Sequence, residues 1–326
     1  GFINNGNTIS SINLTQGSTS IITFPDYSGL FGIKYQGNSA NPIRYNTINN
    51  LNSNTSDNSA CHIFAIAKTL GGTHTPLDIH NNTITNLSAN STSPANAQFV
   101  YGIFYNVPDQ GGDPWESGYT NVFQNTVTFL NNNSLYAQNG SSGSRTHGIS
   151  LDVCFARVYN NKVNQIQNAC SNTNTEAFAS VGGIVVLQRY HLVYPTPPDP
   201  NITPQYAEVS ENLIKNLANT STSASGVVGL YYSGPVFPAS SNNITRNFIT
   251  DLSVASTNTS SPFSQIFGIR LGAGSMIVSN NIVSLGDTIG PNVATEITGI
   301  LDQGNGTNRY QHYFNTVFIG GNSSNL

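Results

Sequence analysis

The side chains best suited to chemistry lie in two stretches that are rich in glycine, proline and aromatic residues. Residues 106–119 read NVPDQGGDPWESGY and contain three carboxylates and the single tryptophan of the chain. Residues 188–205 read QRYHLVYPTPPDPNITPQ and combine an arginine, a histidine and two tyrosines. Binding groups usually lie in such insertions on a regular scaffold. The candidate ligand-binding residues are therefore Asp109, Asp113, Trp115, Glu116, Tyr119, Arg189, Tyr190 and Tyr194.

These residues suit two kinds of ligand. The aromatic rings can stack on sugar rings, or they can fold back on the scaffold and bury the loops. The three carboxylates supply oxygen ligands of the kind that calcium binds, but their spacing matches no standard calcium loop. The six histidines show no spacing typical of a zinc site. We therefore expect no cofactor, with a calcium ion at these carboxylates as the alternative.

The rest of the chain repeats one pattern in which an asparagine is flanked by apolar residues at fixed spacing. Its clearest copies are IRYNTINNL at residues 43–51 and IHNNTITNL at residues 79–87. A Gly-Ile pair or a close variant, such as Gly102-Ile103, falls between successive asparagines. A period of 33–51 residues indicates a repeat architecture. The aligned asparagines are Asn7, Asn46, Asn82, Asn125, Asn161, Asn212, Asn247, Asn280 and Asn315.

Each repeat is expected to contain three short strands and no helix. Strong helix formers are scarce, and apolar residues alternate over short runs. We expect the asparagine at a tight bend, because asparagine tolerates the left-handed backbone region and its amides can pair between stacked bends. The apolar residues that follow each glycine should form one stacked, buried column. That column consists of Ile33, Ile103, Ile149, Ile184, Leu230, Ile269 and Ile300.

With asparagines at a short bend and columns of Ile, Val and Leu, the chain resembles the right-handed parallel β-helix. This is the fold of pectate lyases, polygalacturonases, phage tailspikes and many bacterial surface proteins. The resemblance covers the whole chain and implies an all-β solenoid of about nine coils with an asparagine-ladder bend. We expect residues 1–326 to form a single domain, which is an excerpt of a longer chain because no capping repeat is recognisable. The asparagines that carry the resemblance are Asn46, Asn82, Asn161, Asn247 and Asn280.

The enzymes in this resemblance act on polysaccharides and carry their catalytic groups on the outward row of the strand that holds the Gly-Ile pair. Here that row contains no carboxylate. Asp152 and Asp302 lie further along the strand, but four coils separate them by roughly 19 Å, too far for a catalytic pair. Asp152, His147 and His191 are expected near the two loops. The outward row reads Lys34, Ala67, Phe104, Ser150, Val185, Tyr231, Arg270 and Leu301.

Composition excludes several classes of partner. Only 8 % of the residues are charged and the net charge is −4, so the chain offers no basic surface for nucleic acid. No apolar run approaches the roughly 18 residues that a membrane span requires. The three cysteines allow one disulfide and a free thiol, or three small buried side chains. These cysteines are Cys61, Cys154 and Cys170.

The first functional hypothesis is a non-catalytic structural or adhesin module of a secreted or cell-surface protein. Its partners would be surface glycans or neighbouring modules of the same longer protein. The alternatives are a polysaccharide-active lyase or hydrolase, and a glycan-binding module, both of which would use residues 106–119 and 188–205. We expect no catalytic residue, because glycosidic cleavage requires a positioned acid together with a base or nucleophile.

Overall fold

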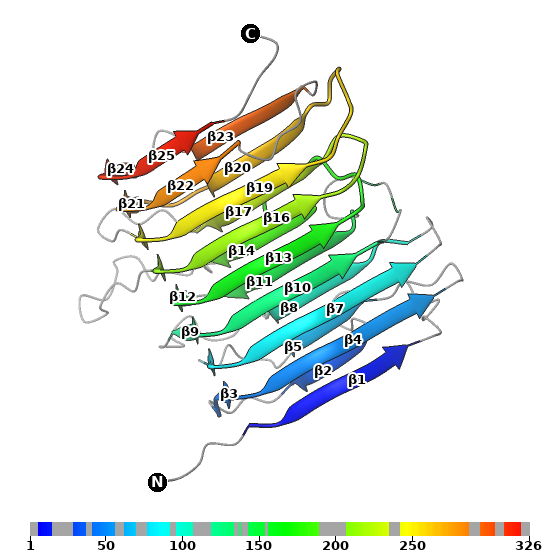
Figure 1. Ribbon diagram of the computed structural model, residues 1–326. Coiled ribbons are helices and arrows are strands. Elements are labelled where there is room, and N and C mark those ends of the chain that lie inside the picture. Colours follow the sequence, from blue (N-terminus) through cyan, green and yellow to red (C-terminus); the bar gives the residue numbers. More distant parts are fainter. Residues whose placement is uncertain are drawn as a thin grey trace, which may run out of the picture.

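The computed structural model is a solenoid of three parallel β-sheets that winds in a right-handed sense (Figure 1). It describes residues 6–14, 29–36, 41–55, 62–69, 77–91, 96–106, 119–133, 136, 138, 143–153, 156–188, 207–234, 242–286, 294–303 and 310–320. Each coil contributes one strand to each sheet, which confirms the predicted parallel β-helix with three strands in a repeat. The described residues form no helix that could span a membrane.

The first sheet follows the asparagine bend and has nine strands. They are β1 (Thr8–Leu14), β4 (Thr47–Thr55), β7 (Thr83–Ser91), β10 (Thr126–Asn132), β13 (Lys162–Asn168), β16 (Leu213–Asn219), β19 (Phe248–Val254), β22 (Ile282–Leu285) and β25 (Thr316–Ile319).

The second sheet contains the Gly-Ile pairs and has eight strands. They are β2 (Leu30–Tyr35), β5 (Ile63–Thr69), β8 (Phe99–Asn106), β11 (Arg145–Val153), β14 (Val181–Gln188), β17 (Gly226–Ser233), β20 (Ser264–Leu271) and β23 (Thr295–Asp302).

The third sheet precedes the bend and also has eight strands. They are β3 (Ile43–Arg44), β6 (Asp78–His80), β9 (Thr120–Phe123), β12 (Ala156–Tyr159), β15 (Glu208–Ser210), β18 (Asn242–Thr245), β21 (Met276–Ser279) and β24 (Tyr310–Tyr313).

The core is one continuous column of aliphatic side chains inside the solenoid. The residues that follow the glycines pair strand to strand from Ile33 to Ile300, which confirms the predicted stacked column. Its central members, such as Ile184, are fully buried. Ile33 and Ile300 are only partly buried, because they lie in the strands at the two ends of the second sheet.

The predicted asparagine ladder is present and runs from Asn7 to Asn315. At Asn161, which is fully buried, the backbone N–H and Nδ2 both donate to Oδ1 of Asn212, each at 3.0 Å. Nδ2 also donates to the carbonyl of Val122 in the preceding coil, at 2.8 Å. The asparagine thus satisfies buried polar groups in two neighbouring coils, as buried backbone groups require.

Two details of the bend differ from the prediction. The ladder residue of the eighth coil is Asn281 and not Asn280, because this register buries Val278 and Val283. The left-handed residue is not the ladder asparagine but the residue before it, with φ between 52° and 58°. The residue type at this position varies, because the interaction with the next coil uses the backbone and not the side chain. In most coils the backbone N–H donates to a carbonyl of the next coil. The left-handed residues are Tyr45, Asn81, Gln124, Asn160, Glu211, Arg246, Asn280 and Phe314.

The glycine of each Gly-Ile pair marks a close approach between the first and second sheets. A Cβ on Gly229 would lie 2.6 Å from Cγ2 of Ile249 and 2.6 Å from the carbonyl oxygen of Gly268. In the second coil, the corresponding residue is Ala65, so the space available for a Cβ at this position differs between coils. Packing therefore selects the smallest side chain here.

We expect Gly229→Ala to destabilise the fold by about 1–3 kcal/mol, because a backbone atom and a buried methyl must both move. Gly272→Ala is the control, since the atoms nearest to its Cβ belong to the side chains of Tyr231 and Ser233 and not to the backbone. Urea unfolding of both variants measures the difference. Equal midpoints would contradict the packing explanation.

Candidate functional site

Most of the predicted ligand-binding residues lie outside the described part of the chain. This holds for Asp109, Asp113, Trp115, Glu116, Arg189, Tyr190 and Tyr194, and also for His191. Tyr119 is described and half-buried just before β9, where the guanidinium carbon of Arg157 lies 3.8 Å from its ring centroid. The ring of Tyr119 thus packs against a neighbouring strand of its own sheet.

The two described residues expected near those loops are buried. His147 is fully buried and its Nε2 lies 2.8 Å from the carbonyl oxygen of Ala179, while Asp152 is 7 % exposed. Among the described residues, no three His, Cys, Asp or Glu side chains are grouped to hold a metal ion. Cys170 is buried, and Cys61 and Cys154 lie outside the described residues.

The outward row of the second sheet has the predicted strand register, but most of it is covered. Val185, Tyr231 and Phe267 pack with Ala179 in a small apolar cluster outside the solenoid. Arg270 is 8 % exposed; it donates to Glu176 and Gln303 at 2.8 Å and also to Thr175. The segment around residues 175–179 therefore lies against this face, which is a packing surface in these coils.

The third sheet carries a column of stacked rings on its outer side. His80 stacks on Phe123 with ring centroids 4.6 Å apart, and Phe123 stacks on Tyr159 at 4.9 Å. The interplanar angles are 6° and 2°, so the rings cover one another's faces. A sugar stacks on an uncovered face of an aromatic ring. Between the two ends of this column the ring faces already cover one another, so they leave no face for a sugar.

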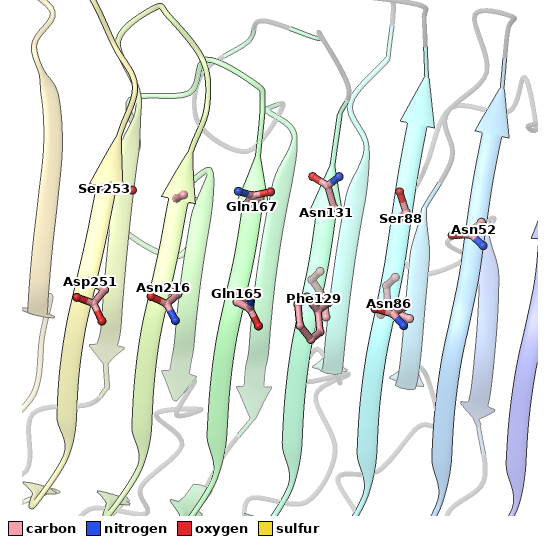
Figure 2. A pocket seen from close by; sticks show the side chains of 13 residues that line it. Asn52, Asn86, Ser88, Phe129, Asn131, Gln165, Gln167, Asn216, Asp251 and Ser253 are labelled. Atoms are coloured by element: carbon pink, nitrogen blue, oxygen red, sulfur yellow. The ribbon is translucent and has the colours of Figure 1, made fainter. Parts of the chain in front are cut away.

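The first sheet carries an open groove of about 630 Å³ on its outer side. The groove crosses six adjacent strands, from β4 to β19, and so runs along the solenoid axis. Figure 2 shows two rows of side chains, one along each side of it. The first row consists of Asn86, Phe129, Gln165, Asn216 and Asp251, and the second of Asn52, Ser88, Asn131, Gln167, Ala218 and Ser253.

The first row exists because each of these strands contains a left-handed residue. The five residues of the row have φ between 54° and 57° and interrupt the regular strand alternation. The left-handed residue and the residue that precedes it therefore both face outward. The residue that follows, such as Leu130, points into the core. The second row pairs in register across the strands, as from Ser88 to Asn131 and from Asn131 to Gln167.

Hydrogen bonds within and between coils orient several of the amides beside the groove. Nδ2 of Asn216 donates to Oδ1 of Asn164 at 2.7 Å, and Nδ2 of Asn164 donates to Oε1 of Gln165 at 3.1 Å. Nδ2 of Asn86 donates to Oδ1 of Asn50 at 3.3 Å. Asp251 is the one charged residue among those that line the groove. The arrangement can therefore form many hydrogen bonds but provides no pair of carboxylates for glycosidic cleavage.

Comparison of the chain with protein-family models, with curated proteins and with solved structures finds no match. The groove was not among the features predicted from the sequence. Polar residues do recur four and six positions after most of the ladder asparagines. This recurrence was not distinctive, because asparagine, serine and threonine are abundant throughout the chain.

Proposed function

We propose that this chain is a non-catalytic module of a secreted or cell-surface protein that holds an elongated ligand along its first sheet. In this proposal the solenoid acts as a rigid scaffold and the ligand is a surface glycan, as expected for an adhesin. The observation that carries the proposal is the groove across six strands, in which eight of the thirteen lining residues are uncharged and polar. Elongated binding surfaces are what solenoids commonly offer.

The absence of a second carboxylate among the residues lining the groove argues for binding rather than cleavage. Hydrolysis of a glycosidic bond requires two carboxyl groups within about 5–10 Å of one another. Asp251 lies in β19, so a partner carboxylate on a neighbouring strand would have to belong to β16 or β22. Neither strand contributes a carboxylate to the groove. Asp251 alone supplies at most one of the two required roles.

The test is to incubate the full chain with a panel of immobilised neutral and acidic polysaccharides. Retention is measured on each, together with new reducing ends and unsaturated products in the supernatant. We expect retention without products, and we expect Asp251→Asn to retain binding within about twofold, because one half-buried carboxylate at the surface contributes little. Retention of no polysaccharide, or turnover that Asp251→Asn abolishes, would refute the proposed function.

A further inference from the structure

We infer that the groove binds an unbranched, uncharged polysaccharide that lies parallel to the solenoid axis and contacts several coils at once. The inference rests on the proposed function and specifies the ligand class, its direction and the residues that bind it. It assigns recognition to the first sheet rather than to the insertions at residues 106–119 and 188–205.

The dimensions of the groove favour a linear polymer. Strands in a sheet lie about 4.8 Å apart, so six strands extend over roughly 24 Å from first to last. A ligand in this groove crosses the strands and meets side chains at the same two positions in five successive coils, from β7 to β19. Contacts that repeat along one direction suit a chain of repeated units better than a compact small molecule.

The chemistry of the lining favours sugar hydroxyls. A carboxamide both donates and accepts hydrogen bonds, as a hydroxyl does, so rows of amides can match either orientation of a sugar hydroxyl. Phe129 lies second in its row, next to Asn86, and is 48 % exposed, which leaves ring surface for the apolar face of a pyranose. Asn86 on one side and Gln165 on the other then flank the stacked sugar (Figure 2).

The same lining disfavours the other extended polymers. No lysine or arginine lines the groove, so binding of a polyanion would release no counterions, and Asp251 would repel it at one end. One common mode by which an extended peptide docks is addition to a free strand edge. From β4 to β19, each strand of the first sheet already pairs with a neighbour on both sides, so the groove offers no such edge.

The experiment is calorimetric titration of the full chain with neutral linear oligosaccharides, from disaccharides to octasaccharides, and with oligogalacturonates of matched length. We expect the affinity for a neutral series to rise by at least about tenfold with length until the ligand covers the groove, because each further unit adds contacts. We expect the acidic series to bind more weakly than the neutral one.

Phe129→Ala should lower the affinity for the longest neutral oligosaccharide by about tenfold, the usual order for an aromatic stacking contact. Phe263→Ala is the matched control, because Phe263 is equally exposed, at 48 %, but does not line the groove. Asn216→Ala should weaken binding and Asn243→Ala, on the third sheet, should not. Thermal unfolding of each variant separates lost binding from lost folding.

Three outcomes would overturn the inference while the proposed function stands. They are tighter binding of the acidic series, an affinity that does not increase beyond the disaccharide, and equal binding by the Phe129 and Phe263 variants. Retention of no polysaccharide in the immobilised panel would instead refute both proposals, so the two failures are distinguishable.

Discussion

Acidification from pH 7 to pH 4 is expected to destabilise the fold by about 3 kcal/mol for each of two buried histidines, His62 and His147. Both imidazoles are fully buried. Burial is the main cause that lowers the pKa of His62 to about 3, and the positive charge of Arg145 lowers it further. Burial also lowers the pKa of His147 to about 3, against the opposing effect of its hydrogen bond to Ala179.

The direction follows from proton binding. In the unfolded chain each histidine takes up a proton below its ordinary pKa of about 6.5, whereas the folded chain does not do so until about pH 3. The unfolded state therefore binds more protons between these values. The stabilisation is fully present above pH 6.5 and is lost as the pH falls toward 3.

The measurement is the free energy of unfolding in urea at a series of pH values. His62→Asn keeps an acceptor for the backbone N–H of Phe99, which now donates to Nδ1 at 3.0 Å, and His147→Gln keeps a donor for Ala179. Each variant should flatten the pH dependence by about half, because it removes one of two similar groups. His312→Gln, at an exposed residue, is the control. An unchanged slope in both buried variants would contradict the prediction.

Removal of one ladder asparagine from the middle of the solenoid is expected to cost about 3–5 kcal/mol, because several buried polar groups lose their partners together. Asn161→Ala deprives the backbone N–H and Nδ2 of Asn125 of their shared acceptor, Oδ1 of Asn161. It also removes the donor to the carbonyl of Val122. All these atoms lie where water does not reach, since Asn161 is fully buried.

Asn7→Ala and Asn90→Ala are controls in which water can replace the lost bonds. Asn7 is the first ladder residue and is exposed, and Asn90 bonds to Asn54 at the surface. We expect each to cost less than about 1 kcal/mol. Urea unfolding at neutral pH gives the three values. If Asn161→Ala were no worse than Asn7→Ala, the ladder would not be a source of stability.

The repeat was readable from the sequence because its determinants are local. The spacing between an asparagine such as Asn82 and the apolar residues after it is set within one strand. Inward and outward side chains alternate there with little influence from distant residues. The three sheets, the column from Ile33 to Ile300 and the ladder itself were therefore predicted correctly.

The two details of the bend that were predicted wrongly depend on how neighbouring coils pack against one another. Asn280 and Asn281 are adjacent in sequence and either fits the pattern, but the ladder takes the one that buries Val278 and Val283. The left-handed backbone lies at the residue before the asparagine because a carbonyl of the next coil accepts its N–H, as at Gln124 and Tyr159. Such a partner is unknown until the coils are stacked.

The sequence by itself determined the repeating coil, the aliphatic core and the polar column at the bend, since each follows from residue type and short-range spacing. The candidate site was decided by tertiary structure alone. A left-handed residue within each strand, such as Phe129 or Asn216, brings an extra side chain to the outer face. Only the stacking of six coils turns those side chains into two rows along one groove. The segment around Glu176 likewise packs against part of the second sheet only in the folded chain. Both features depend on contacts between residues far apart in the chain, which the spacing of residues within one repeat does not specify.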